Sequence, residues 1–268
     1  MFYNGFVRTK QIIFDQEVSM MLAEERFDRI LSLLEQKHTV TVPELCDATG
    51  ASVATIRRDL TILAEQKRLN KVHGGAVAVT ASFESVERDV STKSHLNVEE
   101  KERIARYAAG QIQNEDVVFI DAGTTTLRMV EYLAGTRASF VTTGIECARR
   151  MVQKGLRVYV IGGQLKAGTE AIVGAEALEA IRRYNFTKAF LGTNGITVQQ
   201  GCTTPDAEEA AVKRAAAEQA YLTYVLADSS KFGKVSAVTV CPLSKACILT
   251  DRVPDDQYRQ NGLIKEVD

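Results

Sequence analysis

The chain has 268 residues, of which 45% are hydrophobic and 25% are charged, and its formal net charge is −1. This composition is that of an ordinary globular protein and excludes wholesale disorder. The length favours one domain of nearly two hundred residues plus a smaller module. Because the total charge is balanced, any surface for nucleic acid must arise from local clustering.

The cysteine spacing and the first twenty residues indicate the cellular compartment and whether a metal site is expected. Five cysteines are scattered without a C-x-x-C pair or zinc-ligand spacing, which is typical of reduced cytosolic thiols. No stretch reaches the roughly 20 apolar residues of a membrane span, and residues 1–20 lack the continuous apolar run of a signal peptide. We therefore expect a cytoplasmic protein with no membrane association, no metal site and no cofactor. Residues 1–20 are interpreted as an extension without an assigned function.

Residues 23–50 predict two helices. The first, over residues 23–36, has an apolar stripe at helical spacing, formed by Phe27, Ile30, Leu31 and Leu34. The second begins near Thr41, with Pro43 placed early where its missing N–H costs nothing. It ends near Gly50, which suits a left-handed position after a helix.

A third helix follows, with Ser52 as its cap. Its predicted inward stripe is Val53, Ile56, Leu60 and Leu63. The opposite face carries Thr55, Arg57, Arg58 and Thr61. Two helices joined by a tight glycine turn, the second with hydroxyl and guanidinium groups near its start, can enter a DNA major groove.

Residues 66–77 predict a β-hairpin wing, because a basic turn is followed by a short alternating run and a glycine pair. Residues 21–80 hold equal numbers of basic and acidic residues, but residues 51–80 hold five Lys and Arg against two Asp and Glu. The positive charge thus collects where phosphates would lie. The pattern alone also allows a helical dimerisation module whose Arg57-Arg58 pair is merely solvated.

Two motifs resemble a known family. Residues 52–60 (SVATIRRDL), followed by residues 72–76 (VHGGA), closely resemble the DNA-binding domain of the DeoR family of bacterial regulators. The resemblance implies a winged helix-turn-helix over residues 21–78. It implies that six residues serve DNA binding: Ser52, Thr55, Arg57 and Arg58 on the helix, and Lys71 and His73 on the wing. It also implies that Asp59 braces an arginine instead of touching DNA.

The rest of the chain predicts a linker and an α/β domain. Residues 79–97 are polar and are interpreted as a linker. A helix over residues 98–112 leads into the predicted strands, which cover residues 117–121, 139–142, 158–161, 188–192, 223–228 and 246–250. Helical stretches separate most of them, so we expect residues 98–268 to form a mostly parallel sheet with helices on both faces.

Small and polar residues collect where the predicted strands end, which is where open sheets of this kind bind ligands. Residues 117–126 run from a strand through a Gly-Thr loop into a helix, offering N–H groups and hydroxyls to an anion. No G-K-[ST] follows, so this is not a P-loop. The predicted effector site comprises Asp121, Gly123, Thr124, Thr125, Thr126, Thr142, Thr143, Gly144, Gly163, Asn194, Asp228 and Lys231. Any single one of these loops could equally be an ordinary strand-to-helix turn.

The C-terminal half also resembles the DeoR-family sensor, whose fold is related to ribose-5-phosphate isomerase. Overall the resemblance spans residues 21–255, and residues 190–195 and 201–213 look most like the fructose-operon repressors. It implies a sugar-phosphate inducer, which for this subgroup is fructose 1-phosphate. The sequence departs from the family at Thr143, where Asn is usual, and at Thr187, where Asp is usual.

The prediction is thus a DNA-binding transcriptional regulator, a repressor of a sugar operon and not an enzyme. It would bind operator duplex as a homo-oligomer under the control of a sugar phosphate. An isomerase-like enzyme stays an alternative, with acid and base drawn from Asp121, Asp206, Glu208, Asp228 and Lys231. A third possibility is an oligomerisation scaffold whose loops bind nothing. The sequence does not tell whether the effector releases or promotes DNA binding.

Overall fold

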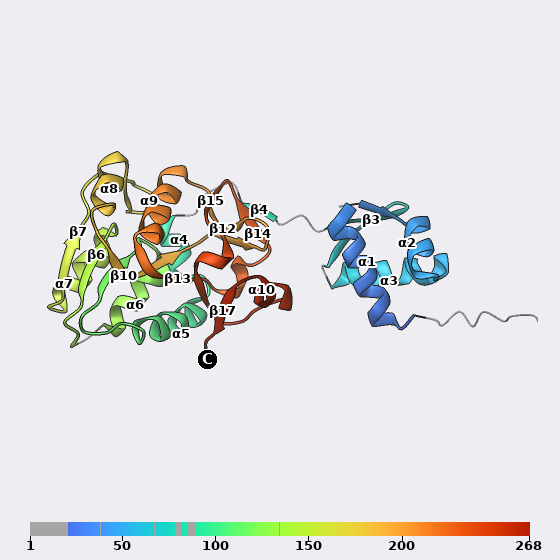
Figure 1. Ribbon diagram of the computed structural model, residues 1–268, viewed down its shortest axis with the longest axis horizontal. Helices are drawn as coiled ribbons and strands as arrows, with labels where there is room; N and C mark the ends of the chain where they lie inside the picture. The colour runs from blue at the N-terminus through green and yellow to red at the C-terminus, as the bar shows by residue number, and fades with distance from the viewer. Residues whose placement is uncertain (1–20, 38, 67, 79–81, 85–88, 134) are drawn as a thin grey trace, which may run out of the picture. The chain divides into compact units, whose positions relative to one another are not determined.

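The computed structural model describes residues 21–37, 39–66, 68–78, 82–84, 89–133 and 135–268. They divide into two compact units, Met1–Thr80 and Ala81–Asp268 (Figure 1). The predicted N-terminal extension, residues 1–20, lies outside the described residues.

The first unit is a winged helix-turn-helix, as predicted. Its elements in chain order are α1 (Ala23–Lys37), β1 (Thr39–Thr41), α2 (Val42–Thr49), α3 (Val53–Glu65), β2 (Leu69–Val72) and β3 (Gly75–Ala78). Strand β3 lies between β1 and β2 and is antiparallel to both. The core beneath the helices includes Ile30, Leu34, Leu45, Ile56, Leu60 and Leu63.

Local signals fix the turn between α2 and α3. Thr41 and Glu44 form a capping box at the start of α2, in which the Thr41 N–H donates to Glu44 Oε2 at 2.9 Å. Gly50 ends α2 with φ of 68°, a left-handed conformation that few side chains tolerate. The inward stripe of α3 holds except at Val53, which is 47% exposed because it lies in the first turn, beyond the core.

The second unit is built on a seven-stranded parallel sheet with the order β17-β16-β13-β10-β5-β6-β7. The strands are β5 (Val117–Ile120), β6 (Ser139–Thr142), β7 (Arg157–Val160), β10 (Phe186–Gly192), β13 (Ala220–Leu226), β16 (Cys247–Thr250) and β17 (Leu263–Glu266). The six predicted strands are all present. Strand β17 was not predicted, because it lies at the sheet edge and none of its residues is fully buried.

Helices cover both faces of this sheet, which confirms the predicted α/β class. They are α4 (Val90–Ser94), α5 (Val98–Ala109), α6 (Thr124–Met129), α7 (Ile145–Gln153), α8 (Ala175–Ile181), α9 (Ala207–Glu218) and α10 (Asp256–Asn261). Two hydrophobic clusters take alternate residues of the strands: one packs against α8 and α9, the other against α5, α6 and α7 (Figure 1). No helix in the described part of the chain is long and apolar enough to cross a membrane.

Smaller strands complete the second unit. Strands β11 (Gly195–Thr197), β12 (Gly201–Thr204) and β15 (Val238–Cys241) form an antiparallel sheet, and β8 (Gln164–Leu165) pairs with β9 (Ile172–Val173). Strand β4 (Ser82–Glu84) runs parallel to β14 (Lys234–Ser236). The predicted linker, residues 79–97, therefore needs correction from residue 82 onward: β4 and α4 belong to the second unit. Their polar composition concealed this, because β4 is held by backbone pairing with β14.

The order in which the chain adds strands to the sheet reverses between β5 and β10. From β5 the chain places β6 and β7 successively on one side, whereas β10, β13, β16 and β17 extend on the other. In open parallel sheets, the crevice beyond the carboxyl ends of the two strands at such a switch point is where ligands bind. Asp121 and Gly192 stand at the ends of these two strands, so the fold directs attention to that place.

Candidate nucleic-acid interface and anion pocket

The first turns of α3 present the predicted DNA-binding groups. Ser52 caps the helix: its Oγ accepts from the Thr55 N–H at 3.2 Å and lies 2.9 Å from Thr55 Oγ1. Arg57 and Arg58 are exposed, and neither side chain hydrogen-bonds or ion-pairs with another described residue. Both guanidinium groups are thus available for phosphate or guanine.

The wing lies beside this helix. Strands β2 and β3 join through a two-residue turn at His73 and Gly74, where Gly74 has φ of +84° and His73 is exposed. Lys71 Nζ donates to Thr61 Oγ1 of α3 at 2.7 Å. The wing is therefore tied to the helix, and the six predicted DNA-binding residues lie on these two elements.

A buried ion pair anchors α3 from behind. Arg26 of α1 donates to both carboxylate oxygens of Asp59, at 2.5 and 3.1 Å, and its third contact is the Met21 carbonyl at 2.8 Å. The side chains are almost completely enclosed. The prediction that Asp59 braces an arginine is confirmed: the partner is Arg26, so Asp59 sets the position of α3 and is not itself offered to DNA.

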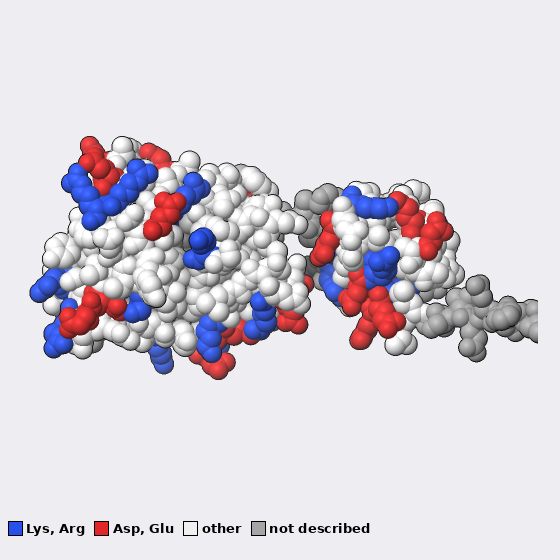
Figure 2. Space-filling model, viewed as in Figure 1, with Lys and Arg blue, Asp and Glu red and all other residues white. Residues whose placement is uncertain are grey.

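The second unit contains a cavity of about 100 Å³ at the switch point. Its floor and walls come from the loops after β5 and β10, from α4, α5 and α9, from the turn after Asp228, and from β4 and β14. Figure 2 shows acidic and basic side chains intermingled on the visible face of each unit, in keeping with the balanced net charge. The concentration of one sign of charge is found instead inside this cavity.

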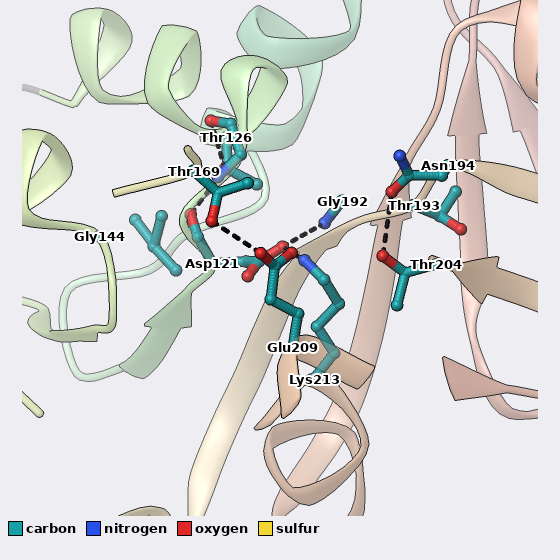
Figure 3. Close-up of polar contacts among 12 residues, drawn as sticks. Asp121, Thr126, Gly144, Thr169, Gly192, Thr193, Asn194, Thr204, Glu209 and Lys213 are labelled. Atoms are coloured by element: carbon teal, nitrogen blue, oxygen red, sulfur yellow. Dashed lines mark hydrogen bonds and ion pairs between the residues drawn. The ribbon is translucent and has the colours of Figure 1, made fainter. Parts of the chain in front are cut away.

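Asp121 organises the base of the pocket (Figure 3). Its carboxylate, 3% exposed, accepts from the Gly192 N–H at 2.9 Å and pairs with Lys213 Nζ of α9. The contact crosses the switch point, because Asp121 follows β5 and Gly192 ends β10. Asp121 thereby holds the Lys213 ammonium at the pocket and is a positioning residue rather than part of its wall.

A second carboxylate, Glu209 of α9, lies near Asp121 (Figure 3). It accepts from Thr169 Oγ1 at 2.7 Å and from Lys166 Nζ at 3.0 Å. Burial acts to raise the pKa of Glu209, but Lys213 and these two donors outweigh it and hold the pKa below its usual value. Glu209 is therefore a charged acceptor with two donors on one carboxylate oxygen.

Lysines dominate the electrostatics of the cavity. Five of them line it, against two glutamates, Glu84 and Glu209; the lysines are Lys93, Lys101, Lys213, Lys231 and Lys234. Burial lowers the pKa of Lys93 and of Lys101 to about 8, so the charged form of each side chain is less stable here than in water. A ligand with two negative charges would relieve that cost, as a phosphate monoester does.

Five of the predicted effector residues line this cavity: Gly123, Thr124, Thr125, Asn194 and Lys231. Asn194 is held by its own N–H, which donates to the Thr203 carbonyl at 3.0 Å, and by Thr204 Oγ1, which donates to its side-chain oxygen at 3.1 Å. Lys231 makes no hydrogen bond or ion pair from its side chain to another described residue. Its charge is thus the least compensated in the pocket.

The remaining predicted residues do not line the cavity, and for four of them the structure gives another role. Thr126 Oγ1 closes the turn before α6, accepting from the Gly123 N–H at 2.9 Å. Thr142 Oγ1 donates to the Ile120 carbonyl at 2.6 Å. Gly144 and Gly163 are glycines because a Cβ would lie 3.1 Å from the Ala122 Cα and 2.6 Å from the Val173 carbonyl oxygen, respectively. Turn geometry and packing thus account for these four residues without a ligand.

Thr143 and Asp228 are also buried, and each keeps one oxygen, Thr143 Oγ1 and Asp228 Oδ2, without a hydrogen-bond partner in the described residues. The other carboxylate oxygen of Asp228 accepts from Asn97 Nδ2 at 2.8 Å and from the Ser230 N–H at 3.1 Å. Asp228 thus shapes the turn that presents Lys231. Asp121, Thr143 and Asp228 lie behind the pocket wall.

Sequence reasoning missed most of the charged lining: Glu84, Lys93, Lys101, Glu209, Lys213 and Lys234. A signal existed for two of these lysines. Lys101 precedes Ile104, Ala105 and Ala108 at helical spacing, and Lys213 precedes Ala216, so both lie on buried helix faces. A lysine on an apolar stripe is uncommon, because an unpaired buried ammonium is costly.

Comparisons with known proteins agree with this division. Residues 26–82 match the DeoR-like helix-turn-helix domain, and residues 96–252 match the DeoR C terminal sensor domain. The HTH-type transcriptional regulator FruR of Bacillus subtilis is 39% identical over 251 residues, which cover 92% of this chain and 99% of that protein. The glycerol-3-phosphate regulon repressor of Escherichia coli is 32% identical, over 87% of this chain and 93% of that protein.

Among solved structures, ribose 5-phosphate isomerase A from Methanocaldococcus jannaschii is similar over 51% of this chain and 55% of that one, with a TM-score of 0.39 and 15% identity.

An exposed reading helix and a separate sensor unit on one chain define a regulator of transcription. The chain belongs to the DeoR family of helix-turn-helix transcriptional regulators. Members of that family are not enzymes, which removes the isomerase alternative.

Proposed function

We propose that this protein represses a sugar-utilisation operon and that a phosphorylated sugar, fructose 1-phosphate, bound in the lysine-lined pocket controls its operator binding. The single observation that carries the proposal is the pocket itself: five lysines gather at the switch point of the sheet, on a chain that also presents an unpaired Arg57-Arg58 pair. Operator binding requires the protein to share a compartment with DNA, so we keep the prediction of a cytoplasmic protein.

The pocket's polar groups suit a phosphorylated sugar. Ammonium groups are point-charge donors to phosphate, and Lys231 and Lys213 both line the pocket. Hydroxyl and amide groups of Thr124, Thr193 and Asn194 add neutral donors and acceptors of the kind that orient sugar hydroxyls. Helix α6 is only six residues long, so we assign the attraction for phosphate mainly to the lysines and not to the helix end expected from the sequence.

The choice of sugar is supported by relatives. The 39% identical protein carries the name FruR, and other relatives are a glycerol-3-phosphate regulon repressor and a lactose phosphotransferase system repressor. The names of these relatives thus refer to regulators of genes for sugars or for phosphorylated carbon compounds. Fructose 1-phosphate is the specific member of that class that we propose here.

The control itself needs two binding events that influence each other. Two or more copies would place their α3 helices on repeated half-sites of the operator. The effector would act by binding one arrangement of these reading heads more tightly than another, and the same coupling would make operator alter effector affinity.

Calorimetry of the full chain against fructose 1-phosphate, fructose 6-phosphate, glycerol 3-phosphate and unphosphorylated fructose tests the proposal. We expect fructose 1-phosphate to bind most tightly and fructose not at all, and a gel shift on operator DNA to change when the tight binder is added. Binding of a different phosphorylated sugar would correct the effector. Absence of binding to every phosphorylated sugar, with no rise in thermal stability, would favour a scaffold.

Lys231→Ala is expected to weaken fructose 1-phosphate binding by about tenfold to a hundredfold, because it removes one charge-assisted contact worth about 1.5–3 kcal/mol. Operator binding without effector should be unchanged. Calorimetry and gel shift on the same preparation measure both. Lys245→Ala, which removes an exposed lysine outside the pocket, is the matched control; an equal loss in that variant would indicate a general charge effect.

Effector affinity is expected to fall as the pH rises above about 8. Burial lowers the pKa of Lys93 and Lys101 to about 8, and a bound dianion would raise both again. Binding is therefore strongest between about pH 6, above which the phosphate is a dianion, and about pH 8, and it weakens as the pH rises further, with proton uptake on binding. Calorimetry at pH 7, 8 and 9 in buffers of different ionisation enthalpy measures the uptake; a constant affinity with no proton exchange would contradict the assignment of these lysines.

A further inference from the structure

Cys202 and Cys241 lie on β12 and β15, two strands of the small antiparallel sheet (Figure 1). Strand β12 pairs with β15 in a register that sets Cys202 directly opposite Cys241. Both cysteines belong to the same buried hydrophobic cluster. Side chains directly opposite each other in antiparallel strands have Cβ atoms about 4.5–5.5 Å apart, near the separation that a disulfide spans. The two sulfurs can therefore bond with little movement of the strands.

The two cysteines differ in access. Cys202 has no exposed surface, whereas Cys241 is 6% exposed and lines a groove of about 770 Å³ on the second unit. Arg214 of α9 lines the same groove and is held there because it donates to the carbonyls of Thr239 and Val240. Cys241 thus lies at a groove beside the charged Arg214 side chain, whereas Cys202 is fully enclosed.

Electrostatics divide the roles in the same way. A hydrogen bond from Cys202 lowers the pKa of Cys241; burial opposes this effect, and the charge of Arg214 adds to it. That same hydrogen bond, together with burial, raises the pKa of Cys202. Since the thiolate is the reactive form of cysteine, Cys241 is suited to attack an oxidant. Cys202 is suited to form the disulfide with the oxidised Cys241.

We propose that Cys241 and Cys202 are a peroxide-reactive pair that closes to an intramolecular disulfide. The Cys241 thiolate attacks one oxygen of hydrogen peroxide, which breaks the O–O bond and gives a sulfenic acid and hydroxide. The Cys202 sulfur then attacks Sγ of Cys241, the S–S bond forms, and the sulfenic hydroxyl leaves as water with the Cys202 proton. The two sulfurs together lose two electrons to the peroxide, and a dithiol reductant reverses the change.

The bond would act on a strand that supports the effector pocket. The Thr203 carbonyl, next to Cys202, accepts from Thr193 Oγ1 at 2.9 Å and from the Asn194 N–H at 3.0 Å, and both of these residues line the pocket. A covalent link at Cys202 would also lie beside the register shift between Cys202 and Thr203. This extension to effector affinity rests on the proposed function; the disulfide does not.

Treatment of the full chain with a few equivalents of hydrogen peroxide, followed by non-reducing digestion and mass spectrometry, tests the proposal. We expect a Cys202–Cys241 linked peptide and a loss of two mass units that a dithiol restores. In Cys202→Ala the reaction should stop at the sulfenic acid of Cys241, which a 1,3-diketone such as dimedone traps. In Cys241→Ala neither product should form.

Cys247→Ala is the matched control, because Cys247 lines the same groove but does not face another cysteine in the described strand pairings. It should leave the linked peptide unchanged. Absence of that peptide in peroxide-treated wild type that still gives its native circular dichroism would overturn the proposal, as would dimedone labelling of Cys247 in place of Cys241. Unchanged fructose 1-phosphate affinity in the oxidised protein would remove only the link to the pocket.

Discussion

Arg58→Ala is expected to abolish specific operator binding at physiological salt while leaving fructose 1-phosphate binding intact. Arg58 is exposed on α3, and its side chain makes no hydrogen bond or ion pair with another described residue. Removing one good arginine contact to a base costs about 1–3 kcal/mol, a factor of roughly ten to a hundred for each reading head. An operator bound by two copies multiplies that loss.

Gel shifts on specific and scrambled duplexes over a range of salt distinguish a base contact from a phosphate contact. Loss confined to the specific duplex indicates base reading. Equal loss on both duplexes, with a salt dependence shallower by about one ion, indicates phosphate. Arg29→Ala, which removes an exposed arginine of α1, is the matched control. Wild-type operator affinity in the Arg58 variant would refute the placement of α3 in the major groove.

Asp59→Ala is expected to destabilise the first unit by about 3–5 kcal/mol, because it leaves the Arg26 guanidinium buried without its partner. A unit of this size has little stability to spare, so α3 should open and operator binding should fail as well. The described part of this unit contains no tryptophan or tyrosine, so intrinsic fluorescence would not report its unfolding. Hydrogen exchange of peptides from residues 53–65 measures it directly.

Two further variants separate the causes. Asp28→Ala removes an exposed carboxylate of α1 and should leave exchange unchanged. The double substitution Arg26→Met with Asp59→Leu replaces the pair by apolar side chains of similar size and should recover most of the stability. If Asp59→Ala exchanges no faster than wild type, the ion pair does not hold α3 in place.

The sequence predicted those parts of the fold that repeat a simple period. Six parallel strands were found because strands buried on both faces appear as continuous apolar runs, as in residues 117–120. The helix-turn-helix was found because Thr41, Gly50 and Ser52 are local signals that act on their immediate neighbours. Strand β17 and strand β4 were not found, because neither carries such a pattern. Strand β17 pairs with β16 at the sheet edge, and β4 is held by backbone pairing with the distant strand β14.

The cavity at the switch point includes five of the residues predicted for the effector site, but most of its charged lining was not predicted. Residues near strand ends were expected to bind the anion, yet Thr126 and Thr142 use their hydroxyls to satisfy nearby backbone groups. The charge comes instead from α4, α5, α9 and β14, which are separated by up to 141 positions in the chain, from Lys93 to Lys234. Only the folded topology brings such distant lysines together, and helical spacing gave a signal for Lys101 and Lys213 alone.

Strand β4, which follows the DNA-binding unit in the chain, also lines the cavity through Glu84. Glu84 of β4 pairs with Lys234 of β14 at 2.8 Å, and both side chains border the cavity. A phosphate that engaged Lys234 would compete with Glu84 for the same ammonium and so loosen the first anchored stretch beyond the reading unit. The effect of the bound sugar phosphate would then reach the DNA-binding unit through β4, without any change in the seven-stranded sheet.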